Sequence, residues 1–153
     1  MPLTRDEDIA QLLANARTVA MTGASDRPSR PSYGVMKFLQ DWGYRVFPVN
    51  PQITGEHVLG EFVWRECAQI GVPIDIVDIF RRPEAAAEAV DQAIFIGAKA
   101  VWMQIGVINE EAAARAETAG LQVVMDRCPK IEIMRLGVPR LSSPALAGEG
   151  DRT

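Results

Sequence analysis

Short apolar runs alternate with longer amphipathic segments along most of the chain, and this alternation limits the fold more than any other feature. Runs that are apolar at successive positions are typical of strands buried on both faces, and the segments between them repeat at helical spacing. Such alternation predicts βαβ units and a parallel sheet with helices on both faces. We therefore predict an α/β fold, a three-layer doubly wound sheet of about five parallel strands. The expected strands are residues 17–22, 44–49, 74–80, 100–104 and 121–126.

Polar and glycine residues mark where the helices are expected to begin and end. Residues 4–7 (Thr-Arg-Asp-Glu) have the pattern of a capping box, which predicts a helix directly after them. Ser32 and Asn109 are the expected N-caps of two later helices, and Gly43 is expected to end the first of these. After the second strand we expect a turn-rich excursion and a helix over 64–70. Further helices are expected over 83–96 and 129–136.

The length of 153 residues suits a single domain, which we place at residues 1–138. Residues 139–153 are rich in proline, glycine, serine and alanine, and we predict that they form a disordered tail.

The net charge of −4 argues against nucleic-acid binding, which needs a basic surface. No apolar run is long enough for a membrane helix. Two distant cysteines do not form a disulfide framework, so we expect a cytoplasmic protein.

In an open parallel sheet, ligands bind at the carboxyl ends of the strands. The first of these loops, Gly23-Ala24-Ser25, follows a strand and precedes a helix. Free backbone N–H groups and the positive end of a helix would favour an anion there, although Gly23 could also serve only a tight turn. Four arginines fall in or beside such loops and indicate phosphate recognition when taken together, whereas any one alone suits a solvated surface. They are Arg27, Arg30, Arg81 and Arg82.

The dinucleotide-binding fingerprint is absent from this first loop. After Gly23 the next glycine is Gly34, and no acidic residue occurs between Trp42 and Gly55 to bind a ribose. These departures disfavour NAD. An NAD(P)-dependent oxidoreductase nevertheless stays open as an alternative, with Arg45 as the residue that would approach a 2′-phosphate.

The chain resembles the stand-alone CoA-binding domain proteins, which are similar to the amino-terminal domain of the succinyl-CoA synthetase alpha subunit. The resemblance covers roughly residues 5–136 and implies a Rossmann-like domain that binds coenzyme A. It departs from the family at Glu132-Ile133, where relatives often carry Glu-His, so no role of that histidine is expected here. The matching fragments are VAMTGASDRP (19–28), SYGVMKFL (32–39), GYRVFPVNP (43–51), VDIFRRPE (77–84), AKAVWMQIG (98–106), NEEA (109–112) and AGLQVVMDRC (119–128).

The resemblance implies a role for each strand-end loop in holding the cofactor. The first loop would line the diphosphate, and the second would border the adenine and ribose. The third would contact the nucleotide, and the fourth would lie near the pantetheine arm. In that order the residues are Gly23, Ala24 and Ser25; Val49, Asn50 and Pro51; Phe80 and Arg81; and Gln104, Ile105 and Gly106.

Catalytic residues do not emerge from the sequence. His57 is the sole histidine and lies in an irregular stretch, and one histidine cannot complete a Ser-His-Asp triad or a metal cluster. Asp78 and Asp126, near strand ends, could bind a metal or a sugar hydroxyl, but loop capping is the more common role. We therefore predict a protein without catalysis of its own that binds CoA or acyl-CoA as a carrier, sensor or regulator. Alternatively, it is a component of an acyl-CoA synthetase acting with a separate subunit; a homodimer or a partner enzyme fits either prediction.

Cys128 follows the fifth strand, close to where the thiol arm of a ligand would end. Beside it, Arg127 would favour a thiolate, so a mixed disulfide with CoA is one hypothesis and an inert buried cysteine is the other. Cys67, within the helix expected over 64–70, is assigned to the core.

Overall fold

The computed structural model describes residues 1–141 and has a five-stranded parallel sheet at its centre. The strand order is β2-β1-β5-β6-β7, so the first strand lies between the second strand and the third strand of this sheet. Each strand falls inside a predicted range, and the α/β prediction is confirmed. The strands are β1 (Thr18–Thr22), β2 (Arg45–Val49), β5 (Ile76–Ile79), β6 (Ala100–Met103) and β7 (Gln122–Val124).

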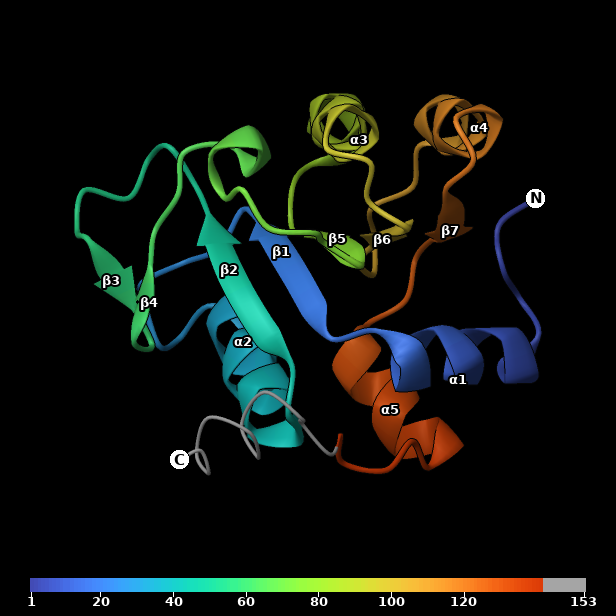
Figure 1. The fold of residues 1–153 in the computed structure, drawn as a ribbon, viewed down its shortest axis with the longest axis horizontal. Helices are drawn as coiled ribbons and strands as arrows, with labels where there is room; N and C mark the ends of the chain where they lie inside the picture. The colour runs from blue at the N-terminus through green and yellow to red at the C-terminus, as the bar shows by residue number, and fades with distance from the viewer. Residues whose placement is uncertain (142–153) are drawn as a thin grey trace.

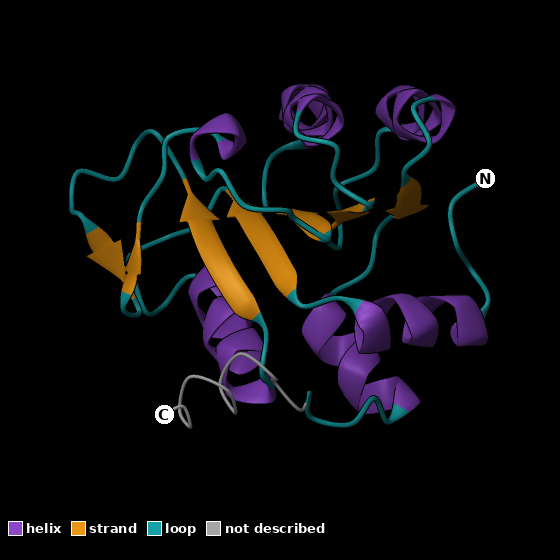
Figure 2. Ribbon diagram, viewed as in Figure 1, coloured by secondary structure: helices purple, strands orange, loops and turns teal. Residues whose placement is uncertain are grey.

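Helices cover both faces of the sheet (Figures 1 and 2). One layer consists of α1 (Asp6–Asn15), α2 (Pro31–Trp42) and α5 (Pro129–Leu136), and the other of α3 (Ala86–Phe95) and α4 (Glu110–Thr118). A short 3₁₀ turn, η2 (Pro83–Ala85), leads into α3, where the sequence predicted one continuous helix. None of the helices in residues 1–141 is long and apolar enough to cross a membrane.

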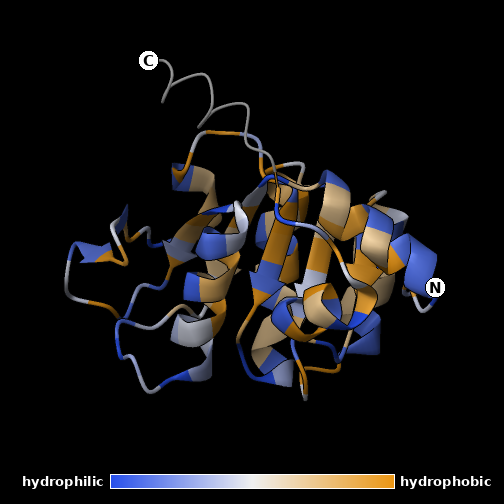
Figure 3. Ribbon diagram, turned by 90° about the horizontal axis from the view of Figure 1, so that it is seen from below, coloured by the Kyte–Doolittle hydropathy of each residue, from blue (hydrophilic) through white to orange (hydrophobic). Residues whose placement is uncertain are grey.

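The sheet separates two apolar cores. On the α1, α2 and α5 side the core is built around Trp102, Leu13 and Met36, and on the α3 and α4 side around Val77 and Met103. All five side chains are at most 1% exposed. The central strands are largely orange in Figure 3, whereas the helices also carry hydrophilic segments. This burial on both faces explains why the strands are apolar at successive positions rather than at alternate ones.

Two of the three expected N-caps are wrong. Thr4 does not cap α1, because Arg5 takes the N-cap position and no side chain caps the helix. Ser32 lies inside the first turn of α2 and is buried, because Pro31, whose fixed backbone suits a helix start, begins that helix. Asn109 is confirmed as a cap: its side chain accepts a hydrogen bond from the backbone N–H of Ala112 at 3.0 Å.

The helix expected over 64–70 is also wrong. Only η1 (Cys67–Gln69) is helical, and it is a single 3₁₀ turn. Before it lies an unpredicted hairpin of β3 (His57–Val58) and β4 (Glu61–Phe62). Trp64 then runs beside the end of β2, where its N–H donates to the carbonyl of Pro48 at 2.9 Å. Pairing with β2 therefore fixes this segment in an extended conformation.

Arg140 and Leu141, which follow the boundary expected at residue 138, both contact Trp42 of α2. The N–H of Leu141 donates to the carbonyl of Trp42 at 2.9 Å, and the guanidinium of Arg140 lies 4.6 Å from the Trp42 ring centroid. Gly43, confirmed in the left-handed conformation that ends α2, packs against Leu141. The remainder of the expected tail, residues 142–153, lies outside the described residues.

Candidate functional site

The order in which the strands are added to the sheet reverses between β1 and β5, and this reversal places a crevice at the carboxyl ends of these two strands. The connection after β1 runs through α2 on one face of the sheet, whereas the connection after β5 runs through α3 on the other (Figure 1). Because the two connections leave in opposite directions, the loops that begin them separate and leave a space above the strand ends. This is the position where open α/β sheets bind ligands.

Gly23, the first residue after β1, allows the two loops of the crevice to touch. Its φ of 77° lies in the left-handed region, and a Cβ at this position would be 2.0 Å from the carbonyl oxygen of Phe80. Its N–H donates to the carbonyl of Val49 at 3.0 Å, which extends the pairing with β2 by one residue. Gly23 is therefore needed because its backbone contacts the loop after β5 and also bonds to β2, so it does more than allow a tight turn.

A cavity of about 660 Å³, which we call the loop cleft, lies over this contact. Ala24 and Ser25 both line this cavity, and their N–H groups donate to no acceptor within residues 1–141. The first turn of α2 borders the same cavity and carries no acidic residue. Free N–H groups beside a helix N-terminus favour an anion. The loop cleft is lined by residues 23–27, 30–32, 50–54 and 80–82.

All four arginines singled out in the sequence line the loop cleft, whereas Asp26 is the one acidic residue among its described lining. Arg81 is 32% exposed and lies 3.7 Å from the carboxylate of Glu88. The other three are exposed and form no ion pair with any residue of the described chain. An acidic protein thus concentrates unpaired positive charge at one cleft, which favours a ligand with several phosphates over scattered surface arginines.

Asn50 ties the loop after β2 to the loop after β1. Its side-chain amide donates to the carbonyl of Ala24 at 2.8 Å, and its side-chain oxygen accepts from the N–H of Gln52, also at 2.8 Å. Because both ends of the side chain are used within the protein, Asn50 shapes the cleft wall and leaves Pro51 and the neighbouring backbone to meet a ligand.

A second cavity of about 650 Å³ adjoins the loop cleft and shares Pro31 and residues 80–82 with it. We call it the apolar groove, because most of its side chains are apolar. Gln104 is 6% exposed within it, and its side-chain oxygen has no hydrogen-bond partner in residues 1–141. A buried acceptor without a partner is costly, so a hydrogen bond from a ligand or a water molecule that reaches this oxygen would be stabilising. The apolar groove is lined by Pro31, Val35, residues 80–83 and 104–107, Cys128 and Ile131.

The structure brings eleven of the twelve residues expected at the site to these two cavities. Val49 is the exception: it is buried and lines a neighbouring cavity on the α3 side of the sheet, because alternate residues of a strand point to opposite faces; that cavity shares Pro51 and Arg81 with the loop cleft. Arg45, the alternative contact for a 2′-phosphate, begins β2 and therefore lies at the opposite edge of the sheet. There it pairs with Glu61 at 2.7 Å. Arg45 is therefore not placed to bind the 2′-phosphate of a cofactor at the carboxyl ends of the strands.

The other polar candidates do not form a catalytic group. Asp78 lies within β5 and is fully buried, and burial raises the pKa of its carboxyl well above the usual range. Asp126 accepts a hydrogen bond from the N–H of Gly106 at 2.7 Å and so caps the loop, as its position indicated. His57 is exposed on β3 and its ring contacts Phe62 edge-on.

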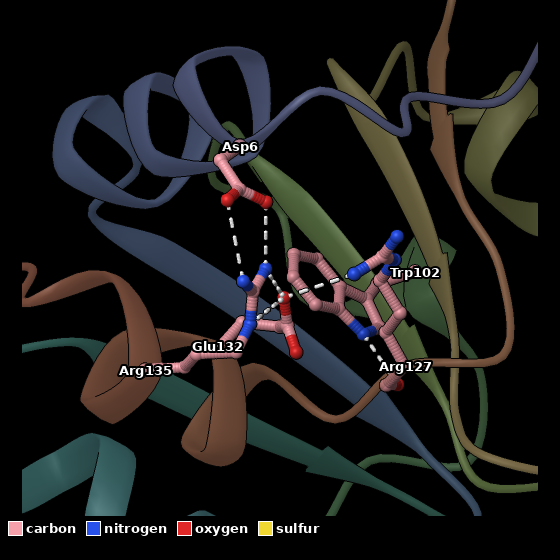
Figure 4. Close-up of polar contacts among 5 residues, drawn as sticks. All are labelled: Asp6, Trp102, Arg127, Glu132 and Arg135. Atoms are coloured by element: carbon pink, nitrogen blue, oxygen red, sulfur yellow. Dashed lines mark hydrogen bonds and ion pairs between the residues drawn. The ribbon is translucent and has the colours of Figure 1, made fainter.

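A group of charged side chains holds α5 beneath the apolar groove (Figure 4). Glu132 is 7% exposed in its side chain and accepts hydrogen bonds from Arg127 at 3.1 Å and Arg135 at 2.7 Å. Arg135 also donates to Asp6 of α1, and these hydrogen bonds lower the pKa of the Asp6 carboxyl. Trp102 fixes the same loop by donating to the carbonyl of Arg127 at 2.8 Å. Arg127 is thereby engaged with Glu132 instead of standing free beside Cys128.

Sequence reasoning missed part of the lining of both cavities. Residues 52–54 border the loop cleft because β2 is followed by an extended excursion, and Val35 and Ile131 reach the apolar groove from α2 and α5. The Asn-Pro turn that ends β2 indicated the first of these segments. The last two are apolar helix residues, which the sequence alone does not distinguish from core.

Several known proteins resemble this chain in sequence or in fold. A protein from Bacillus subtilis, strain 168, called "Uncharacterized protein YneT", is 38% identical over 124 residues, which cover 81% of this chain and 90% of YneT. The crystal structure of Prb, described as the PH1109 protein redesigned for binding, has a TM-score of 0.86 and 38% identity over 94% of this chain and 99% of Prb. A hypothetical protein from Pyrococcus horikoshii OT3 has a TM-score of 0.84 and 41% identity over 89% and 96% of the two chains.

A more distant likeness concerns the fold alone. The dinucleotide-forming acetyl-coenzyme A synthetase 1 of Ca. Korarchaeum cryptofilum has a TM-score of 0.66 at 21% identity, over 76% of this chain and 27% of the synthetase. The family model described as "CoA binding domain" matches residues 17–134, which include every strand of the sheet and both cavities. This chain belongs to the CoA binding domain family.

Proposed function

We propose that the protein binds coenzyme A or an acyl-CoA across the loop cleft and the apolar groove, and that it acts as a non-catalytic carrier, sensor or regulator. The observation that carries the proposal is the junction of two unlike cavities at one edge of the sheet. One is lined by arginines and free N–H groups, and the other is apolar with a single unpartnered acceptor. Coenzyme A has the same two halves, a phosphate-rich nucleotide and a largely apolar arm with amide groups.

The cleft supports a specific orientation of the nucleotide. The N–H groups of Ala24 and Ser25 would hold the diphosphate, and Pro51 would border the adenosine. Arg27, Arg30 and Arg82 are unpaired in the described chain and are candidates for the remaining phosphate. The arm would then pass Phe80 into the apolar groove, where its amide N–H groups would meet the side-chain oxygen of Gln104.

Calorimetric titration tests this proposal. Coenzyme A should bind, and dephospho-CoA and ADP should bind more weakly, because the first lacks one phosphate and the second lacks the arm. Replacing Arg30 and Arg82 together by alanine should weaken CoA binding by about tenfold or more, since each charge-assisted hydrogen bond contributes about 1.5–3 kcal/mol. Arg5→Ala, an exposed arginine on the α1 side, is the matched control and should leave affinity unchanged. No binding of any of the three ligands would overturn the proposal.

The same titration with NADH addresses the oxidoreductase alternative. Tight NADH binding in place of CoA would favour that alternative. We expect none, because the residues at the end of β2 offer no carboxylate for a ribose and Arg45 lies at the other edge of the sheet.

A second candidate function is a component of an acyl-CoA synthetase that acts with a separate subunit. Exposed apolar side chains at and beside the mouth of the apolar groove favour it: Ile105 is 60% exposed, Ile131 47% and Met134 58%. A co-purifying chain that forms acyl-CoA from an acid, ATP and CoA only when this protein is added would support it. The same activity without this protein would contradict it.

The two cysteines support our proposal that the protein works in the cytoplasm. Cys67 and Cys128 are both free thiols, and free thiols are typical of reducing compartments.

A further inference from the structure

Cys128 borders the apolar groove, while the other cysteine does not reach either cavity. Cys128 is 7% exposed and takes the N-cap position of α5, where its carbonyl accepts from the N–H of Glu132. Cys67 is 1% exposed in the core beneath α3, and burial raises the pKa of its thiol to about 12. Cys128 therefore lines the apolar groove from the boundary of the core that contains Trp102, whereas Cys67 lines neither cavity.

Gln104 gives an independent sign that the apolar groove receives a polar ligand. Its side chain is 6% exposed, lines the groove together with Cys128, and leaves its oxygen without a partner in the described residues. Natural proteins rarely leave such an acceptor unsatisfied unless a ligand or water completes it. A ligand arm that satisfies Gln104 enters the cavity on which the thiol of Cys128 borders.

We propose that Cys128 exchanges with the disulfide form of coenzyme A and becomes covalently linked to one CoA, so that the protein reports the oxidation state of the CoA pool. This inference rests on the proposed function, because the nucleotide in the loop cleft is what brings the disulfide to the groove. The inference also differs from the proposed function, because CoA binding alone requires no reaction at Cys128.

The step balances without any further oxidant. The Cys128 thiolate attacks one sulfur of the CoA disulfide, a Cys128–CoA disulfide bond forms and the bond between the two CoA sulfurs breaks. The departing CoA leaves as a thiolate and takes up the proton that Cys128 released. The cysteine and the retained CoA share the new disulfide, and one CoA is reduced; an excess of reduced thiol reverses the step.

The position of Cys128 makes the reaction selective. Cys128 is only 7% exposed, so a small disulfide from bulk solvent has little access to it. A disulfide anchored by its nucleotide is delivered along the groove at high effective concentration. The guanidinium of the neighbouring Arg127 is paired with Glu132 and does not stand free beside this sulfur.

Intact-mass measurement of the full chain under non-reducing conditions tests the proposal. Incubation with CoA disulfide should add one CoA per chain, and peptide mapping should place it on Cys128. Cys128→Ser should show no adduct, and the matched variant Cys67→Ser should behave as the unsubstituted protein. Glutathione disulfide at the same concentration should react at least about tenfold more slowly. An adduct on Cys67, an adduct that persists in Cys128→Ser, or equal rates with the two disulfides would overturn the proposal.

Two further measurements separate this inference from the proposed function. Calorimetry with reduced CoA on the unsubstituted protein is run in parallel: binding without an adduct overturns only the exchange at Cys128, whereas no binding and no adduct overturns both. Gln104→Leu keeps a similar volume but removes the acceptor, so adduct formation from CoA disulfide should slow by about fivefold or more. An unchanged rate of adduct formation in Gln104→Leu would contradict the proposal that the arm of CoA passes through the apolar groove.

Discussion

Gly23 shows how one residue can be required by both the fold and the ligand. Its backbone is left-handed, and any Cβ here would lie 2.0 Å from the Phe80 carbonyl oxygen, so there is room for hydrogen alone. The sequence indicated a tight turn or an anion site at this glycine. The structure adds the close contact with the loop after β5, which no local pattern reveals because Phe80 is far away along the chain.

Gly23→Ala should destabilise the fold and abolish CoA binding. The left-handed backbone alone costs about 1–2 kcal/mol for a residue with a Cβ, and the contact with Phe80 adds to this. Gly34→Ala is the matched control: Gly34 is helical with open space around it, so alanine should raise the free energy of unfolding by about 0.5–1 kcal/mol and leave CoA binding unchanged. Urea titration with calorimetry checks both. Equal stability of the two variants would contradict the role of Gly23.

At the scale of elements, α5 is held in place by charge as well as by apolar packing. Glu132 lies between Arg127 of the preceding loop and Arg135 of its own helix, and Arg135 continues to Asp6 of α1 (Figure 4). The sequence predicted the bounds of α5 correctly from Pro129 to Leu136. It could not predict this network, because its members are brought together only by the tertiary fold.

Glu132→Gln should lower the free energy of unfolding by about 1–2 kcal/mol, because it removes the charge that two arginines share while keeping the side-chain volume. Asp6→Asn should have a smaller effect, since Asp6 is exposed to solvent. Urea unfolding of the two variants checks this order. If Asp6→Asn lowered the free energy of unfolding as much as Glu132→Gln, the buried carboxylate of Glu132 would contribute no more than the exposed one of Asp6.

The elements that sequence reasoning missed are short or paired to something distant. β3 and β4 have two residues each, too few for a period to show, and Leu59 and Gly60 between them have positive φ. Trp64 was expected to begin a helix. It lies along β2 instead, because its backbone forms hydrogen bonds with that strand. Propensity is a weak guide where a neighbouring strand offers hydrogen bonds.

At the scale of the whole molecule, the alternation of apolar runs and amphipathic segments was enough to predict the sheet and both helical layers. Each predicted strand is present, although β5 is confined to Ile76–Ile79 and β7 to Gln122–Val124. The general rule for strand ends then located the cavities, and only Val49 among the expected residues points elsewhere. The order of the strands, and so the crevice between β1 and β5, came from the structure.

Asp78 should make the stability of the whole domain depend on pH. Its carboxyl is fully buried, neither oxygen has a partner in the described chain, and Tyr44, the one polar residue beside it in the enclosing cavity, donates instead to the carbonyl of Leu13. Burial therefore raises the pKa of Asp78 well above its usual value of 3.8. Above that value the unfolded chain loses the proton while the folded chain keeps it, so stability falls as pH rises until the folded pKa is passed.

Within that window the fall attributable to Asp78 should be about 1.4 kcal/mol per pH unit. Asp78→Asn cannot lose a proton and should lack this fall. Urea unfolding of both proteins, at steps of about one pH unit between roughly pH 5 and roughly pH 8, gives the difference directly. A difference that stays constant with pH would show that Asp78 is ionised in the folded protein.

The central claim is that coenzyme A lies across the carboxyl ends of β1, β2, β5 and β6. Amide hydrogen exchange with and without CoA, followed by mass spectrometry, tests its position directly. We predict slower exchange in residues 23–27, 30–32, 50–54, 80–83 and 104–107, which line the two cavities, and no change in the loops at the opposite edge of the sheet, such as residues 72–75 and 97–99. Protection at that opposite edge, or none in the residues after β1 and β5, would contradict this position for the cofactor.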